Sequence, residues 1–83
     1  MDDKLKALRD RIDAIDSQLL ELMNQRAAIA RDIGLLKGDG PIYRPEREAQ
    51  VLGRLRERNA GPLPGAAIEH LFVELISACR AVE

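Results

Sequence analysis

Residues 5–37 read LKALRDRIDAIDSQLLELMNQRAAIARDIGLLK, and this stretch decides the fold. Apolar residues recur in it at alternating spacings of three and four, which is the heptad spacing of helices that pack along a shared seam. The apolar seam positions are Leu5, Leu8, Ile12, Ile15, Leu19, Leu22, Ile29, Ile33 and Leu36. The pattern predicts one long helix whose seam packs against another helix.

Arg26 takes the single seam position that is not apolar. A guanidinium in a hydrophobic seam is costly unless an anionic group meets it there. One interpretation is a structural residue that sets the register of a dimer by pairing with an acid of the partner chain. The other is a binding residue for an anionic ligand, and we take Arg26 as a candidate of that kind.

The composition argues against several classes of function. The chain has 83 residues, thirteen Lys and Arg against fourteen Asp and Glu, and a formal net charge of −1. Its basic residues are scattered among acids instead of forming a basic stripe, so nucleic acid is not the expected partner. One His and one Cys cannot assemble a zinc site, so no metal is expected. The lone cysteine suits a reducing compartment, and no signal peptide or apolar run of membrane length is present, so we expect a cytoplasmic chain without a membrane partner.

Three helices are expected, making one all-α domain over residues 1–83. The first is capped by Asp2 or Asp3 and runs to about Lys37, where Gly38-Asp39-Gly40-Pro41 stops it. Pro45 suits the first position of a second helix that runs to about Arg58. A third begins at about Pro64 and reaches the C-terminus without a cap, which suggests the front part of a longer protein.

The length of the first helix predicts a second copy of the chain. At 1.5 Å per residue this helix spans roughly 50 Å, whereas a compact globule of this size is only about 30 Å across. One chain cannot cover so long a seam. We therefore expect an intertwined homodimer in which the two long helices pair antiparallel.

In such a dimer, charged residues from both chains meet. Arg9 lies about 26 Å along the helix from Arg26, too far to share a small ligand within one chain. If the helices cross near residue 20, Arg9 of one copy faces about residue 31 of the other, between Arg26 and Lys37. These cations then form a pocket for a small dianion, twice per dimer. Glu48 and Glu83 fall on otherwise apolar faces of the shorter helices and are candidates to contact a hydroxyl.

Several motifs occur along the chain in a fixed order: Leu8-Arg9-Asp10-Arg11-Ile12-Asp13-Ala14-Ile15-Asp16, Leu19-Leu20-Glu21-Leu22, Arg26, Gly34 with Lys37, and Tyr43-Arg44-Pro45-Glu46-Arg47-Glu48. In this order the chain resembles the all-helical chorismate mutases, most closely the N-terminal mutase domain of bifunctional chorismate mutase and prephenate dehydratase proteins. The resemblance implies the pericyclic, Claisen-type rearrangement of chorismate to prephenate without a cofactor. It also makes a prephenate dehydratase domain the fusion partner to look for after residue 83.

The resemblance implies roles for individual residues. Arg26, together with Arg9 of the partner chain, clamps the two substrate carboxylates. Lys37 reaches a carboxylate and the ether oxygen, where negative charge grows in the transition state. Glu48 accepts a hydrogen bond from the ring hydroxyl, and Arg47 beside it adds to the positive field.

Three positions depart from the family's best-known pattern. Arg44 stands where some members have an acid near the substrate hydroxyl, so only its backbone is expected to keep that contact. Cys79 stands where some members have Ser, and a thiol donates only a weak hydrogen bond to a carboxylate. Glu83 stands where others have Gln or Glu, and a Glu donates to the ether oxygen only when protonated. We therefore expect activity to fall as rising pH removes the Glu83 proton.

Two other functions remain open at this point. Isochorismate pyruvate lyase resembles these mutases in fold and uses a similar cationic pocket. A non-catalytic helical dimerisation or regulatory module is the alternative of a different class, with Arg26 as its structural pairing residue.

Gly34 bears on packing, because a glycine inside a helix costs about 1 kcal/mol relative to alanine. We expect it to permit the close approach of another helix.

Overall fold

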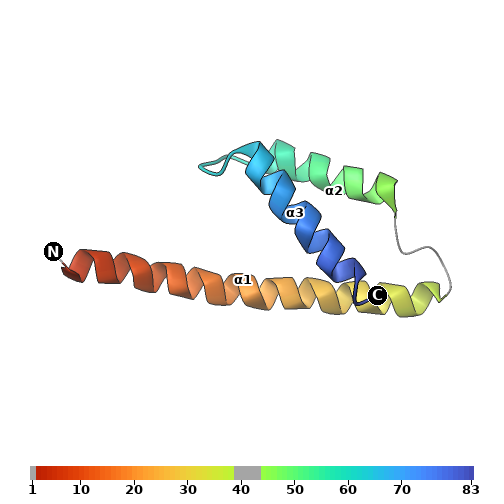
Figure 1. The fold of residues 1–83 in the computed structure, drawn as a ribbon, viewed down its shortest axis with the longest axis horizontal. Helices are drawn as coiled ribbons and strands as arrows, with labels where there is room; N and C mark the ends of the chain where they lie inside the picture. The colour runs from red at the N-terminus through yellow and green to blue at the C-terminus, as the bar shows by residue number, and fades with distance from the viewer. Residues whose placement is uncertain (1, 39–43) are drawn as a thin grey trace.

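The computed structural model describes residues 2–38 and 44–83, and within these ranges the chain forms three helices and no strand (Figure 1). They are α1 (Asp2–Lys37), α2 (Pro45–Arg58) and α3 (Gly65–Arg80). The predicted all-α fold with one long and two shorter helices is confirmed. The predicted stop at Asp39, Gly40 and Pro41 lies outside the described residues.

The ends of α1 follow from local charge and from one glycine. Asp2 and Asp3 lie within its first turn and Lys37 in its last, so both ends carry the charge that opposes the helix dipole. The two aspartates were expected to precede the helix as its cap, whereas α1 already includes them. Gly38 ends the helix at φ 59°, a left-handed conformation that glycine adopts without strain, and its N–H donates to the Gly34 carbonyl at 3.1 Å.

The turn between α2 and α3 is built on Asn59. Its side-chain amide donates to the Leu63 carbonyl at 2.9 Å, and its side-chain oxygen accepts from the Gly61 N–H at 3.0 Å. These bonds close a short loop that sends the chain back along α2 as α3 (Figure 1). Pro45 is the first residue of α2, as predicted.

The third helix stops before the chain end. It was expected to reach the C-terminus, but α3 ends at Arg80, with Ala81 as its C-cap. Glu83 lies beyond it, in a turn where its N–H donates to the Arg80 carbonyl at 3.2 Å. The position of Glu83 therefore depends on this turn and not on helical spacing.

The third helix links the other two. α3 runs obliquely between α1 and α2 and packs against both, while α2 lies apart from α1 (Figure 1). The described part of the chain measures 57 × 24 × 15 Å, and its radius of gyration is 16.2 Å. A compact chain of this length would have a radius of gyration of about 12 Å. The shape is extended because the N-terminal half of α1 projects beyond the other helices.

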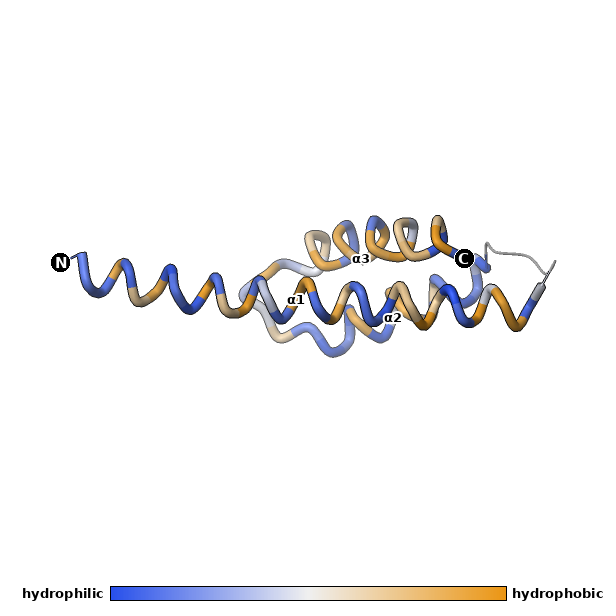
Figure 2. Tube along the Cα trace, turned by 90° about the horizontal axis from the view of Figure 1, so that it is seen from below, coloured by the Kyte–Doolittle hydropathy of each residue, from blue (hydrophilic) through white to orange (hydrophobic). Residues whose placement is uncertain are grey.

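This chain by itself buries little of its apolar surface. Among the described residues only Ala30, Ile76 and Cys79 are buried. Seam residues of the projecting half of α1 stay open, with Leu8 54% and Ile12 56% exposed. Hydrophobic residues recur along the whole of α1 in Figure 2, including the stretch that no other helix covers. An exposed apolar stripe of this length is the expected surface of one member of an intertwined dimer. Across the described ranges, no helix is both long and apolar enough to span a membrane.

Candidate active site

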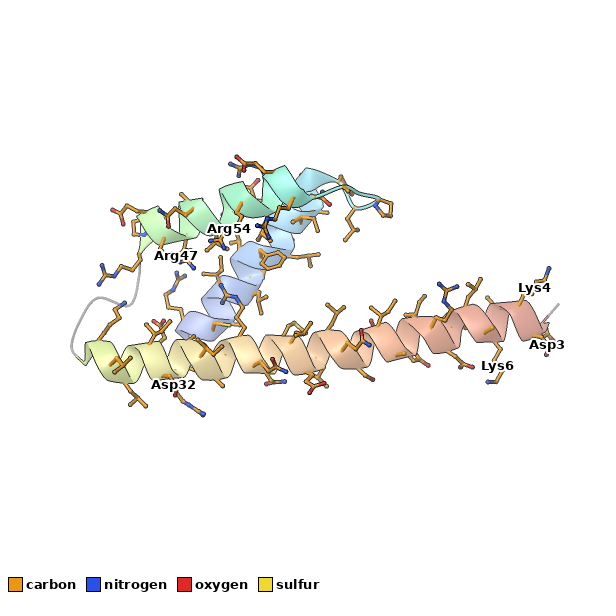
Figure 3. All side chains as sticks on the ribbon, turned by 180° about the vertical axis from the view of Figure 1, so that it is seen from behind. Asp3, Lys4, Lys6, Asp32, Arg47 and Arg54 are labelled. Carbon is orange, nitrogen blue, oxygen red and sulfur yellow. The ribbon has the colours of Figure 1, made fainter. Side chains whose placement is uncertain are left out.

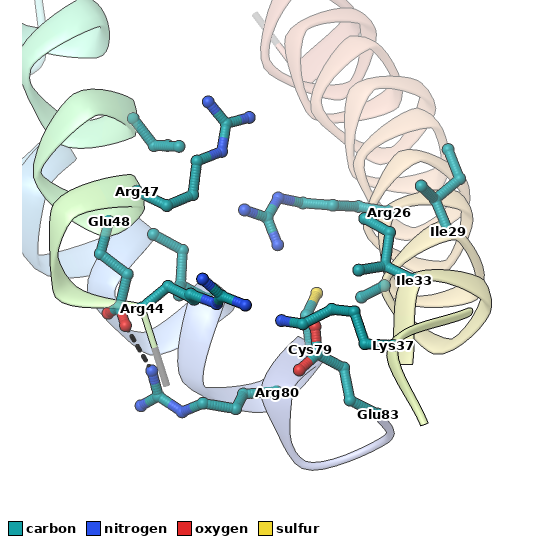
Figure 4. Close-up of a pocket in the computed structure, with 13 residues that line it drawn as sticks. Arg26, Ile29, Ile33, Lys37, Arg44, Arg47, Glu48, Cys79, Arg80 and Glu83 are labelled. Carbon is teal, nitrogen blue, oxygen red and sulfur yellow. Dashed lines mark hydrogen bonds and ion pairs between the residues drawn. The ribbon is translucent and has the colours of Figure 1, made fainter. Parts of the chain in front are cut away.

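A cavity of about 290 Å³ lies between the C-terminal half of α1, the start of α2 and the end of α3 (Figure 4). This volume is near the lower end of the range for small-molecule sites. Its lining is Arg26, Ile29, Ala30, Ile33, Lys37, Arg44, Arg47, Glu48, Val51, Ile76, Cys79, Arg80 and Glu83. The cavity therefore has an aliphatic base and a strongly charged rim.

The charge of the cavity is opposite to that of the chain. Five basic side chains line it against two acidic ones, while the whole chain carries a formal net charge of −1. Arg26, Arg44 and Lys37 point into the space between α1 and the other two helices (Figure 4). Concentrated cations in a partly desolvated pocket attract and bind small anions, with guanidinium groups suited to carboxylates. A small dianion is the ligand that this charge fits best.

Arg26 and Lys37 reach the cavity from the same face of α1. Their separation of eleven residues is close to three full turns of an α-helix, so both project in the same direction. Ile33 lies between them along this face and gives the cavity an apolar wall. Both charged side chains are half-buried.

Glu48 is paired across the helices. Its Oε2 atom accepts a hydrogen bond from Arg80 Nη1 at 2.6 Å, and this ion pair joins the first turn of α2 to the last residue of α3 (Figure 4). The two side chains are 22% and 30% exposed respectively. Arg80 was not identified from the sequence. A basic residue in the last turn of a helix is ordinarily explained by the helix dipole, so the sequence carries no separate signal for this contact.

Glu83 reaches the cavity because Gly34 leaves room for it. A Cβ atom built on Gly34 would lie 2.8 Å from the Glu83 carbonyl oxygen and 3.1 Å from its Cα. The predicted close approach at Gly34 is present, but the predicted partner, another helix, is wrong, because the group that approaches is the turn after α3. Cys79, which is 3% exposed, lies at the base of the same corner.

Seven of the eight site residues predicted from the sequence line this cavity: Arg26, Lys37, Arg44, Arg47, Glu48, Cys79 and Glu83. Arg9 does not, because it lies on the projecting half of α1. That half, which carries Asp3, Lys4 and Lys6, has no other described element of this chain beside it (Figure 3). Within the described ranges no cluster of His, Cys, Asp and Glu could hold a metal ion.

Comparison with known proteins gives one family. Residues 8–83 match the model of the family described as chorismate mutase type II. Over all of its 83 residues the chain is 49% identical to the bifunctional chorismate mutase/prephenate dehydratase of Neisseria gonorrhoeae, and covers 23% of that protein. The chain thus spans about a quarter of the length of such bifunctional relatives.

Two solved structures share the fold. A chorismate mutase from Helicobacter pylori in complex with prephenate superposes with a TM-score of 0.88 at 37% identity, over 94% of this chain and 87% of that one. The chorismate mutase from Thermus thermophilus, in its form II, gives a TM-score of 0.89 at 33% identity, over 92% of this chain and 89% of that one. The arrangement of the helices described above is therefore shared almost end to end with these enzymes.

Proposed function

The chain belongs to the chorismate mutase type II family, and we propose that it converts chorismate to prephenate in the cavity between α1, α2 and α3. One observation carries the assignment to this cavity: it gathers five basic side chains and two acidic ones from the three helices and the residues that flank α2 and α3. Chorismate carries two carboxylates, and the relative from Helicobacter pylori was solved with the dianion prephenate. A small dicarboxylate is what this charge distribution suits.

The reaction is intramolecular and places two demands on the protein. The C–O ether bond breaks as a C–C bond forms, so no group is transferred and no covalent intermediate is needed. Holding the reactive chair-like conformer removes an entropic barrier, and carboxylate clamps at two points achieve this. Hydrogen-bond donors at the ether oxygen then stabilise the negative charge that grows there in the transition state.

The residues of the cavity can meet both demands. Arg26 clamps one carboxylate, and Lys37, on the same face of α1, reaches the other carboxylate and the ether oxygen. Glu83, whose backbone rests on Gly34 of α1, donates to the ether oxygen in its protonated form. Glu48 accepts a hydrogen bond from the ring hydroxyl, while Arg47 contributes to the positive field.

Two other lining residues have smaller parts in the proposal. Arg44, directly before α2, contacts substrate through its backbone. Cys79 offers a weak thiol donor in addition to its packing at the base of the cavity. Neither is expected to contribute as much as the charged groups of α1.

The proposal includes a second copy of the chain. The exposed seam of α1 and the extended shape favour an antiparallel pair of long helices, which would bury that seam. Such a pair carries Arg9 of the partner into the region between Arg26 and Lys37, where it completes the carboxylate clamp. Each dimer then has two equivalent sites.

Two wider expectations belong to the same proposal. In the relatives with a fused prephenate dehydratase, the region that this chain matches is a small part of the protein. A dehydratase domain downstream of residue 83 would use prephenate directly. A cytoplasmic location agrees with the lone cysteine, as the sequence indicates.

The decisive experiment follows the loss of chorismate and the appearance of prephenate with purified wild type, Arg26→Ala and Arg31→Ala. Arg31 is the matched control, because it is an exposed arginine of α1 that does not line the cavity. The proposal is supported if wild type and Arg31→Ala convert chorismate and Arg26→Ala does not. Wild type that leaves chorismate unchanged, or that instead releases pyruvate from isochorismate, contradicts it.

A further inference from the structure

We propose that Arg80 is a positioning residue, which holds the Glu48 carboxylate so that it can accept a hydrogen bond from the ring hydroxyl of the substrate. This inference rests on the proposed function. It assigns a specific task to a residue for which the sequence pattern gives no separate signal.

The geometry of the ion pair is the first support. Arg80 Nη1 lies 2.6 Å from Glu48 Oε2, which is short for a charge-assisted hydrogen bond. Both side chains are more than two thirds covered, so water screens the pair less than a surface ion pair. A carboxylate has two acceptor oxygens, and a bond to Oε2 leaves the capacity of Oε1 for a hydroxyl.

The surroundings of Glu48 explain why such a partner is needed. Arg44 and Arg47 lie within one turn of it, and Arg26 and Lys37 face it from α1 across the cavity. A flexible carboxylate in this field could turn toward any of these cations, and it would then neutralise a group that a substrate carboxylate needs. Pairing with Arg80 fixes Glu48 at the wall between α2 and α3 and keeps the other cations available for substrate.

The competing explanation is that Arg80 binds a substrate carboxylate itself, since it also lines the cavity. The two explanations differ in how Arg80 depends on Glu48. A positioning residue loses its effect when the group that it positions is removed, whereas an independent clamp does not. A double-mutant cycle between the two residues separates them.

The experiment compares Arg80→Met, Glu48→Gln and the double variant, with Arg56→Met as the matched control. Arg56 also joins α2 to α3 through an ion pair, with Glu69 at 3.2 Å, but it does not line the cavity. Arg56→Met therefore shows how much stability is lost when an arginine ion pair between these two helices is removed outside the cavity. Melting temperatures of all four variants accompany the kinetics. If Arg80→Met does not fold, Arg80→Gln takes its place with the same expectations.

The expected loss appears mainly in KM. The ring hydroxyl keeps its character through the rearrangement, so a bond to it is made equally in the bound substrate and in the transition state. We expect Arg80→Met to raise KM about tenfold with a smaller change in kcat, and to weaken prephenate binding by a similar factor. In the Glu48→Gln background the same substitution should change KM by less than about twofold.

Three results would overturn the inference, each in a distinct way. If Arg80→Met has the same kinetics as Arg56→Met, Arg80 has no role in the site. If Arg80→Met raises KM by the same factor in wild type and in the Glu48→Gln background, Arg80 is an independent clamp. Wild type without turnover and without prephenate binding refutes the proposed function itself, and this result does not depend on Arg80.

Discussion

The backbone of Glu83 lies directly against Gly34, at the point where the turn after α3 meets α1. A Cβ atom on Gly34 would lie 2.8 Å from the Glu83 carbonyl oxygen and 3.1 Å from the Glu83 Cβ atom. The absence of a side chain at one residue of α1 thus determines how deeply Glu83 enters the cavity. Glu83 is the residue that the proposed mechanism places at the ether oxygen.

Substitution of Gly34 by alanine should therefore separate activity from helix stability. Alanine favours the helix by about 1 kcal/mol, but its methyl group forces the Glu83 segment away from α1. We expect kcat/KM to fall roughly tenfold, because donors to a developing charge act only at hydrogen-bond distance. Steady-state kinetics and thermal unfolding of Gly34→Ala measure the two effects.

Gly53→Ala is the control for this substitution. Gly53 lies inside α2, and a Cβ atom there would meet only Arg56 Nη2 at 3.8 Å, an ordinary contact. This variant should gain the stability, about 1 kcal/mol, without loss of activity. Equal kinetics for the two variants would mean that Gly34 does not position Glu83.

The fate of Arg26→Leu distinguishes a binding site from a structural pairing residue. Leucine completes the apolar heptad seam, so we expect the proposed dimer to persist and the melting temperature not to fall. Loss of a buried charged hydrogen bond to a substrate carboxylate costs about 2–5 kcal/mol, so kcat/KM should fall by a factor of about 30 or more. Sedimentation and kinetics on the same sample test both halves of the prediction.

Prephenate gives an independent reading of Arg26. A ligand that binds only the native dimer raises its melting temperature. Wild type should show this protection and Arg26→Leu should lose most of it. If prephenate raises the melting temperature of both proteins equally, it binds at another place and Arg26 has a structural role.

The helices and the charged residues that interrupt apolar faces could be predicted from local rules, whereas other site residues, such as Arg47 and Cys79, were assigned by the family resemblance. Seam spacing placed α1, and Pro45 placed the start of α2. Arg26 and Glu48 were conspicuous because each interrupts an apolar face. A charged residue in an apolar pattern is a strong local signal, since its burial requires a compensating group.

Arg80 and the true end of α3 were missed for a different physical reason. The Arg80–Glu48 pair joins residues that are 32 positions apart, and it depends on where the end of α3 meets the start of α2. Glu83 was assigned to a helical face, but it occupies a turn that rests on Gly34. Contacts of this kind follow from tertiary packing, which no spacing along one helix contains.

Mixing two inactive variants tests whether Arg9 acts across the proposed dimer. Arg9→Ala removes the partner's arginine from both sites, and Arg26→Ala removes the local one from both. In a mixed dimer the site that keeps Arg26 faces the chain that keeps Arg9, so one of the two sites is intact. Random exchange of subunits makes half of the dimers mixed, and activity should recover to about a quarter of that of wild type.

The recovery should depend on subunit exchange. Each variant is refolded alone and then with the other, and activity is measured at equal total protein. Two variants that stay inactive together, although mixed dimers are detected by mass spectrometry, would show that Arg9 is not shared between chains.

The pH dependence of turnover tests the proposed task of Glu83. A carboxyl group donates a hydrogen bond only while it holds its proton, so a donor role for Glu83 requires activity to decline as pH rises. Glutamine at this position has the same reach and donates at every pH. Glu83→Gln should therefore keep its kcat at the higher pH values at which the kcat of wild type has declined.

Glu69→Gln is the matched control for this profile. Glu69 belongs to α3 as well, but it pairs with Arg56 outside the cavity. Its amide variant should keep the pH profile of wild type, since no reacting group lies near it. If the activities of Glu83→Gln and Glu69→Gln both decline with pH as that of wild type does, Glu83 is not the donor, and Lys37 is the remaining donor at the ether oxygen.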